Sequence, residues 1–234
     1  MRTMTAMPEP GAVPARDMMA AMNPIAEEDV RIVPANEASW DDLIAIFGTA
    51  DYAGRCHCQR LKVAGWIWRD STQEQRTARL RAQTACGEPG ARGATATSGL
   101  VAYVDGAPAG WVAVEPRTAY PKLRTSRVPW SGRDEDRDDD GVWAVTCFVV
   151  RKGYRGRGLT YPLARATIGF ARERGARALE AYPMITQPGK EITWGELNVG
   201  ARQVFEDAGF QEVSRPTVRR VVMRIDFEPV GDAG

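Results

Sequence analysis

Short apolar runs alternate with amphipathic stretches along the chain from about residue 30 to residue 227. The β-rich runs predict strands at residues 30–33, 100–104, 110–114, 143–150, 178–182 and 219–227. Apolar side chains at helical spacing predict helices just after Ser39 and at about 72–84, 160–174 and 198–208. Between the second and third runs, Asp105 and Gly106 predict the tight turn of a β-hairpin.

This order of elements, β-αα-βββ-α-β-α-β, predicts an α+β (mixed α/β) fold. We expect a mixed, largely antiparallel central sheet with helices on both faces. Residues 1–28 contain five methionines by Met19, several prolines and no hydrophobic period. They predict a disordered leader, followed by a single domain over residues 29–234.

Candidate chemistry is concentrated in residues 148–160, where an apolar strand runs into a glycine-rich turn and a helix begins at Thr160. Gly153, Gly156 and Gly158 allow turn conformations that a Cβ disfavours, and they let the backbone approach a ligand closely. The first amides of the following helix lack intrahelical partners and lie at the positive end of its dipole. The turn therefore predicts a site for a phosphate-bearing ligand.

Two well-known phosphate loops do not fit this turn. A P-loop requires Lys-Ser or Lys-Thr after its last glycine, whereas Leu159 and Thr160 follow Gly158 here. A dinucleotide fingerprint requires Gly-x-Gly-x-x-Gly near the start of a βαβ unit, and the third glycine is missing. Spacing therefore excludes both loops.

The turn resembles the acetyl-CoA signature of the GNAT acetyltransferase superfamily, Arg/Gln-x-x-Gly-x-Gly/Ala after a short strand. Arg155 takes the first position and Gly158 the fourth, while Thr160 stands where the family usually has glycine or alanine. The resemblance implies the GNAT fold, acetyl-CoA as co-substrate and no metal. It also implies that the strand end, Phe148, Val149 and Val150, pairs with the pantetheine arm.

The same resemblance implies which residues hold the pyrophosphate, namely the backbone amides of Arg155, Gly156, Arg157, Gly158, Leu159 and Thr160. A second landmark of the family is an asparagine seven residues before a tyrosine that protonates the departing thiolate. Asn198 keeps the asparagine position and is expected to meet the cofactor, but Phe205 replaces the tyrosine. We expect Phe205 to be a buried core residue.

The family's usual positions for a general base are also unable to take a proton here, because they hold Ala144 and Thr146. Acetyl transfer requires a neutral amine, so a base elsewhere or a water relay must act. The sequence offers Glu115 and Glu180 as candidate bases and Tyr182 as a candidate acid. For each carboxylate, a solvated surface position is the competing interpretation.

Composition excludes several partner classes. The chain has 234 residues and a net charge of +1, with 31 basic and 30 acidic side chains, so no overall field favours nucleic acid or a membrane surface. No apolar run approaches the ~20 residues that span a bilayer. Four cysteines do not suggest a disulfide framework, which favours a reducing cytoplasm. The oligomeric state is left open between a monomer and a homodimer.

Two further segments have competing interpretations. Cys56-His57-Cys58 has no second ligand pair at zinc spacing, so we expect a packed wall with Trp66 and Trp68 that borders the acceptor site. Cys147 is expected to be a small core residue. Residues 134–140 carry six carboxylates, which indicates either a solvated loop or an electrostatic lure for a cationic amine.

The sequence thus predicts an acetyl-CoA-dependent N-acetyltransferase that moves an acetyl group directly to a primary amine of a small molecule or a protein. One alternative is a non-catalytic acyl-CoA sensor, which the residues Ala144 and Phe205 favour. Another alternative is an enzyme that uses a longer acyl-CoA. The acceptor itself is not specified by the sequence.

Overall fold

The computed structural model describes residues 24–48, 52–88, 97–186 and 192–228. Its strands form one seven-stranded sheet in the order β1-β2-β3-β4-β5-β7-β6. The strands are β1 (Val30–Pro34), β2 (Leu100–Val104), β3 (Ala107–Pro116), β4 (Val142–Val150), β5 (Ala178–Ala181), β6 (Gln211–Thr217) and β7 (Arg220–Asp226). Only β4 and β5 pair in parallel, so the predicted mixed, largely antiparallel sheet is confirmed.

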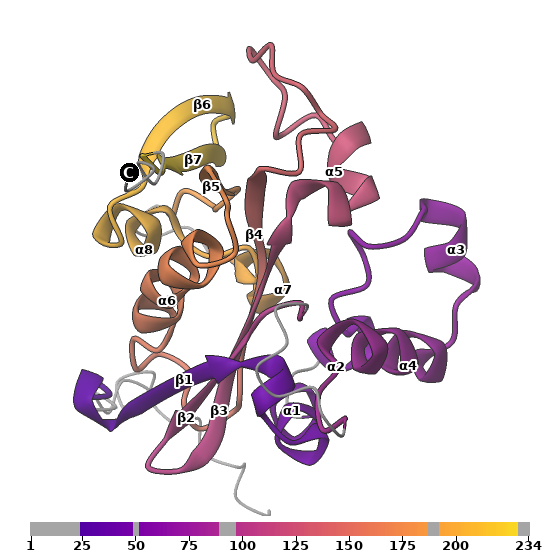
Figure 1. Ribbon diagram of the computed structural model, residues 1–234, viewed down its shortest axis with the longest axis vertical. Helices are drawn as coiled ribbons and strands as arrows, with labels where there is room; N and C mark the ends of the chain where they lie inside the picture. Colours follow the sequence, from indigo (N-terminus) through magenta and orange to yellow (C-terminus); the bar gives the residue numbers. More distant parts are fainter. Residues whose placement is uncertain (1–23, 49–51, 89–96, 187–191, 229–234) are drawn as a thin grey trace, which may run out of the picture.

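Helices cover both faces of this sheet, with α6 and α8 on one side and α1, α2 and α4 on the other (Figure 1). The α-helices are α1 (Trp40–Phe47), α2 (Ala53–Cys56), α3 (Gly65–Asp70), α4 (Gln73–Thr84), α5 (Pro121–Thr125), α6 (Thr160–Arg172), α7 (Trp194–Leu197) and α8 (Arg202–Asp207). Short 3₁₀ turns lie at Glu27–Asp29, Ala35–Glu37 and Arg117–Ala119. The Ser39 side chain caps α1, and Thr72 with Gln75 forms a capping box at α4, as their sequences favour.

Alternation along β3 and β4 divides the core into two layers, because successive side chains of a strand point to opposite faces. Val112 and Phe148 join the layer beneath α6, where they pack with Leu163. Trp111 and Cys147 join the layer beneath α1. The strand that ends in the glycine-rich turn is therefore fixed from both sides.

Strands β4 and β5 separate part-way along their length, and this separation creates the site. They pair only from Val142 to Val145, opposite residues 178–181. Beyond that point β4 continues to Val150, while the chain after β5 meets the turn before α8 through the Met184–Ala201 bridge. The second half of β4 thus faces an opening instead of a neighbouring strand.

The predicted helix at 198–208 is wrong in its first turn, since α8 begins only at Arg202. Gly200 has φ +83°, and a Cβ there would lie 2.7 Å from the Phe205 ring, so the chain turns at this glycine. The predicted final strand is in fact the second half of a hairpin. Its partner β6 is a mostly exposed edge strand without apolar alternation, which is why the hydrophobic pattern does not reveal it.

The predicted leader extended too far, because residues 24–28 belong to the folded unit. The Ile25 amide donates to the Arg157 carbonyl oxygen at 3.0 Å, and Glu27 pairs with Arg165 of α6 at 3.0 Å. Residues 1–23 lie outside the described residues.

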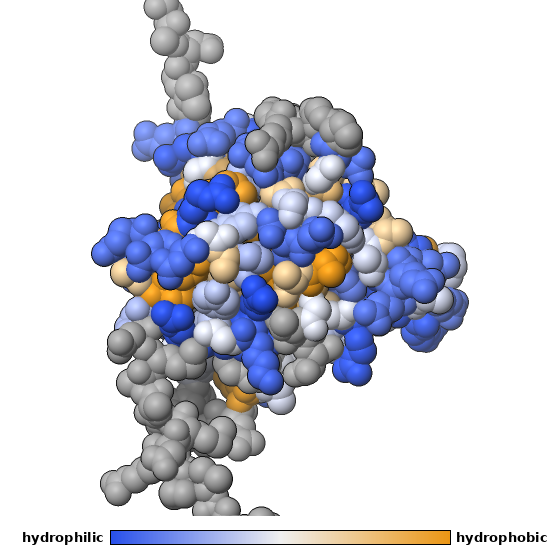
Figure 2. Space-filling view, turned by 90° about the horizontal axis from the view of Figure 1, so that it is seen from below, coloured by the Kyte–Doolittle hydropathy of each residue, from blue (hydrophilic) through white to orange (hydrophobic). Residues whose placement is uncertain are grey.

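In the face drawn in Figure 2, hydrophilic residues dominate and hydrophobic ones form separate patches. Within the described parts of the chain, every helix is too short or too polar to cross a membrane.

Candidate functional site

The glycine-rich turn after β4 depends on three left-handed residues. Gly153, Gly156 and Gly158 have φ values of +96°, +71° and +83°. A Cβ at any of them would meet nothing within 4 Å, so the backbone conformation itself, and not crowding, requires glycine. This confirms the conformational part of the sequence argument.

The backbone of this turn presents donors to the opening beside β4. The amides of Gly156, Gly158 and Leu159 donate to no other described residue. The Leu159 side chain is buried against Gly110 of β3, where an added Cβ would lie 2.9 Å from Leu159 Cδ2. Thr160 does not cap α6, because Leu159 occupies the N-cap position and makes no side-chain cap bond. Backbone N–H groups and the helix dipole are therefore the features that favour an anion.

A cavity of about 440 Å³ lies over this turn. Its lining includes nine of the ten residues that the sequence assigns to the cofactor, all except Arg157: Phe148, Val149, Val150, Arg155, Gly156, Gly158, Leu159, Thr160 and Asn198. The structure thus brings together residues that are 50 positions apart in the sequence. We name this space the donor cavity.

Two backbone groups expected to pair with a pantetheine arm are already bonded within the protein. The Phe148 amide donates to the Asn198 carbonyl oxygen at 2.6 Å. Arg155 Nε donates to the Val150 carbonyl oxygen at 2.9 Å. A pantetheine arm that pairs with these two groups would have to replace both bonds.

A second cavity of about 660 Å³ continues from the first on the far side of Asn198. Its lining combines apolar side chains of the α5 region with Thr146, Tyr182 and arginines of the β6–β7 turn. The two cavities share the lining residues Tyr52, Cys56, Cys58, Cys147, Gly195 and Asn198. We name the second space the acceptor cavity and the shared wall the junction.

Two of the junction thiols, Cys56 and Cys147, have raised pKa values. Burial raises the pKa of Cys56 to about 11. The pKa of Cys147 is raised well above its usual value, by its interaction with the Cys58 side chain first and by burial second. Among the described residues, no group of His, Cys, Asp and Glu side chains is arranged to hold a metal ion. Cys147 is 8% exposed, as expected for a small core residue.

The predicted wall around Cys56-His57-Cys58 is present only in part. The His57 ring stacks on Phe47 of α1 at 5.3 Å and lies 3.4 Å from the Thr77 hydroxyl of α4, so it fills the space between those helices. Trp66 does not join it, because this side chain is 63% exposed on α3.

Glu115 lies near the end of β3 and is not among the residues that line the acceptor cavity. It forms an ion pair with Lys62, whose Nζ also lies 4.5 Å above the Tyr120 ring. Burial raises the pKa of Glu115, although Lys62 opposes the shift, and burial lowers the pKa of Lys62. Burial raises the pKa of Tyr120 well above its usual value, Glu115 raises it further and Thr146 lowers it, while the buried Tyr120 hydroxyl makes no hydrogen bond to the described residues. Thr146 in turn faces the cavity.

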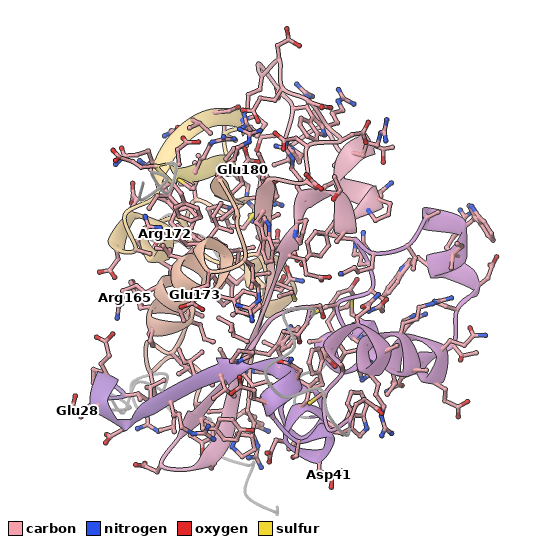
Figure 3. All side chains as sticks on the ribbon, in the orientation of Figure 1. Glu28, Asp41, Arg165, Arg172, Glu173 and Glu180 are labelled. Carbon is pink, nitrogen blue, oxygen red and sulfur yellow. The ribbon has the colours of Figure 1, made fainter. Side chains whose placement is uncertain are left out.

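Glu180, which Figure 3 labels, lies in different surroundings: it is buried on β5 and forms a cluster with three arginines. Its carboxylate contacts Arg117 Nη1 at 3.3 Å, Arg224 Nη1 at 2.9 Å and Arg133 Nη2. The Tyr182 hydroxyl donates to it at 2.9 Å. Both oxygens of Glu180 are thus occupied, and the Tyr182 hydroxyl is directed to Glu180 although its residue lines the acceptor cavity. This arrangement favours a structural role for both groups.

Comparison with known families shows to which family the chain belongs. The model of the acetyltransferase (GNAT) family matches residues 60–210, which include the glycine-rich turn and three of the six junction residues, Cys147, Gly195 and Asn198. The chain belongs to the GNAT acetyltransferase family. Its sheet, with helices on both faces, is the GNAT fold.

Several solved structures resemble this GNAT chain at low identity. The structure of yncA from Salmonella typhimurium with its cofactor acetyl-CoA is 18% identical and has a TM-score of 0.47, with 86% of this chain and 95% of that chain covered. An N-acetyltransferase from Staphylococcus aureus Mu50 is 16% identical (TM-score 0.45; 84% and 98% covered). AAC(6')-Ib in complex with Parmomycin and AcetylCoA is 18% identical (TM-score 0.45; 85% and 93% covered). No curated protein sequence matches the chain.

The sequence did not point to several residues that lie around the acceptor cavity or contact Glu115. Lys62 and Tyr120 are isolated polar and aromatic residues in irregular segments, and only the fold brings them to Glu115. Arg220 was not considered because the β6–β7 turn was not predicted. Thr146 was considered only as a poor base, although its place on the signature strand gives it access to the acceptor cavity.

Proposed function

We propose that this GNAT protein is an acetyl-CoA-dependent N-acetyltransferase that passes the acetyl group directly to a primary amine of a small molecule or protein. The observation that carries the proposal is the junction, where the donor and acceptor cavities share six lining residues. A thioester and an amine bound in these cavities would meet beside Cys147 and Asn198. Both substrates would then be bound at once, in a ternary complex.

The proposed donor site uses the residues identified from the sequence. Amides of residues 155–160 bind the pyrophosphate, Phe148, Val149 and Val150 flank the pantetheine arm, and Asn198 lies beside the thioester. Support comes from the amides that donate to no other described residue and from the α6 N-terminus behind them. Acetyl-CoA supplies the activated acetyl group, and no metal is needed for this reaction.

Positioning is the main catalytic effect that this geometry can provide. The amine nitrogen attacks the thioester carbonyl carbon, the C–S bond breaks, and the CoA thiolate leaves. Holding two reactants in attack geometry can contribute about 7–11 kcal/mol. The shared wall of the two cavities fixes their relative position, so most of the rate enhancement is assigned to it.

We assign the amine proton to Glu115 through a relay of the Thr146 and Tyr120 hydroxyls. Thr146 faces the acceptor cavity, Tyr120 lies behind it, and burial raises the pKa of Glu115 toward the range of a useful base. Glu180 and Tyr182, the other candidates, are assigned to the arginine cluster, because their polar atoms are bonded to one another and to arginines.

One observation favours the second candidate function, a non-catalytic acyl-CoA sensor. Phe205 is fully buried against Phe148 and Phe210, at the place where many family members have a thiolate-protonating tyrosine. A test that separates the two functions measures CoA release with candidate amines alongside acetyl-CoA binding by calorimetry. Turnover supports the transferase, whereas tight binding without turnover of any amine supports the sensor.

We further propose a reducing cytoplasm as the compartment, in keeping with four unpaired cysteines.

A further inference from the structure

The acceptor cavity carries an excess of positive charge. Among its described lining residues, the basic side chains are Arg60, Arg219 and Arg220, and the one acidic side chain is Glu196. Arg219 pairs with Glu196 at 2.9 Å, and Arg60 is an exposed residue whose Nη1 donates to the Tyr52 hydroxyl at 3.1 Å. Arg219 is therefore paired with a carboxylate, and Arg60 is exposed to solvent.

Arg220 differs from both, because it is a partly buried cation without a carboxylate. Its Nη2 donates to the Tyr182 carbonyl oxygen at 2.6 Å, and its buried Nε has no hydrogen-bond partner. Within the described residues, no acidic side chain pairs with it. Burial lowers the pKa of Arg220. A buried cation normally has such a partner.

The backbone holds Arg220 firmly in this position. The Ile185 amide donates to the Arg219 carbonyl oxygen at 2.9 Å, and the Val221 amide donates to the Pro183 carbonyl oxygen at 3.3 Å. Arg220 also forms a bridge with Met184. The guanidinium therefore needs little reorganisation to receive a ligand, which favours binding.

The rest of the acceptor cavity is largely apolar. Side chains without charge line it from three directions: Leu61, Leu123, Val128, Pro129, Met184 and Val199. A space of about 660 Å³ lies in the range of small-molecule sites, about 300–1,000 Å³. The cavity thus suits a compact molecule with an apolar body and one anionic group.

The nearby acidic loop does not alter this charge balance. Glu135 pairs with Arg117 and Arg224, Asp138 with Arg124, and Asp139 with Arg177. None of these carboxylates is among the residues that line the acceptor cavity. The loop therefore gives little support to an electrostatic lure for a cationic amine.

We propose that the acceptor is an amino acid with an apolar side chain, whose carboxylate pairs with Arg220 while its amine points to the junction. This inference rests on the proposed transferase function and adds the acceptor class to it. An arginine can bind a carboxylate with two parallel hydrogen bonds, which fixes the orientation of the acceptor as well as its affinity. The carboxylate also supplies the missing partner of a buried cation.

The test compares leucine, methionine and phenylalanine with their carboxamides, which keep the amine and the apolar side chain but lack the charge. CoA release gives kcat and KM for each, and NMR ligand observation gives binding to the CoA-loaded protein without turnover. Three variants are measured: Arg220→Gln, Arg220→Lys and, as a matched control, Arg215→Gln. Arg215 lies on the adjacent strand β6, is exposed, and lies outside the acceptor cavity.

The proposal expects the acids to be preferred over the amides by about ten- to hundredfold in kcat/KM, the effect of one charged hydrogen-bonded pair. Arg220→Gln should remove that preference through KM and leave acetyl-CoA affinity unchanged. Arg220→Lys should restore part of it, and Arg215→Gln should change nothing. If Arg220→Gln fails to fold, the proposal is tested by the ratio of kcat/KM for the acids to that for the amides, measured in the parent protein and in Arg220→Lys.

Two other outcomes are distinguishable. Acids that bind in an Arg220-dependent manner without any CoA release would support the anion site and overturn the transferase function. Amides used as well as acids, or acids that neither bind nor react while acetyl-CoA binds, would overturn the acceptor assignment alone.

Discussion

Replacing Glu180 with glutamine separates the structural role of this carboxylate from a catalytic one. Glu180 has no exposed side-chain surface, and it forms ion pairs with Arg117, Arg133 and Arg224, whose side chains are 1%, 6% and 11% exposed. Removing one partner of a buried ion pair typically costs about 3–5 kcal/mol, because a charge is left buried and uncompensated. Glutamine keeps the volume, so the charge alone is removed.

The free energy of unfolding of Glu180→Gln should therefore fall by about 3–5 kcal/mol in urea at pH 7, followed by tryptophan fluorescence. For a domain of this size, that loss lowers the Tm by about 6–20 °C. Glu173→Gln is the matched control, because Glu173 is 77% exposed and its ion pair with Arg174 spans 3.9 Å (Figure 3). Its stability should change by less than about 0.5 kcal/mol.

Activity and acetyl-CoA affinity of Glu180→Gln are then measured at a temperature at which the variant is fully folded. The dissociation constant should be unchanged, because Glu180 does not line the donor cavity. A variant that keeps the stability of the parent protein but loses more than about a hundredfold in kcat would refute this reasoning. Glu180 would then be the proton acceptor that the sequence also allowed.

Three further predictions address the donor site, the proton relay and pH. Gly158→Asp should weaken acetyl-CoA binding by about a hundredfold in calorimetry, because it places a negative charge beside the amides proposed to bind the pyrophosphate. Gly106→Asp is the control for backbone strain, since Gly106 has φ +77° and Gly158 has φ +83°. This control variant should bind acetyl-CoA normally. Glu115→Gln should lower kcat by about 10²–10⁴-fold and leave the acetyl-CoA affinity unchanged. In the parent protein, kcat should rise with pH as Glu115 loses its proton, at a pH above its ordinary pKa of 4.5. A change in kcat of less than threefold in Glu115→Gln would exclude the relay. Burial raises the pKa of Glu135, but the positive charges of Arg133 and Arg224 outweigh burial. The pKa of Glu135 is therefore lowered from its ordinary value of 4.5. Glu135 therefore contributes fully to stability above pH 4.5, and this contribution is lost as the pH falls below 4.5. In Glu135→Gln, the free energy of unfolding in urea should decrease less steeply below pH 4.5 than it does in the parent protein.

Local sequence signals predicted several helix starts and the glycine-rich turn. Ser39 and Thr72 mark helix starts, and the glycines of the turn need left-handed backbone, so each acts through neighbours in sequence. The edge strand β6 escaped prediction because its exposed residues do not alternate. The helix at 198–208 was extended too far because the apolar pattern continues across Gly200, where the chain turns.

The acceptor side could not be predicted from sequence, since its residues meet only through long-range packing. Lys62, Glu115 and Tyr120 come from separate segments, and the sequence gives no sign that they adjoin. The sequence offered Glu180 only as a candidate base, because its three arginine partners are distant in the chain. Whether a charge is free or paired depends on tertiary structure, and that decides between a base and a counter-ion.

The most direct test of the central claim is one assay that follows acetyl-CoA, CoA and the acceptor together. Purified protein is incubated with acetyl-CoA and the amino-acid panel, CoA release is followed with a thiol reagent, and the products are identified by mass spectrometry. The account predicts stoichiometric release of CoA and formation of an N-acetyl product, both lost in Gly158→Asp. Tight acetyl-CoA binding by calorimetry, with no CoA release for any amine, would contradict it.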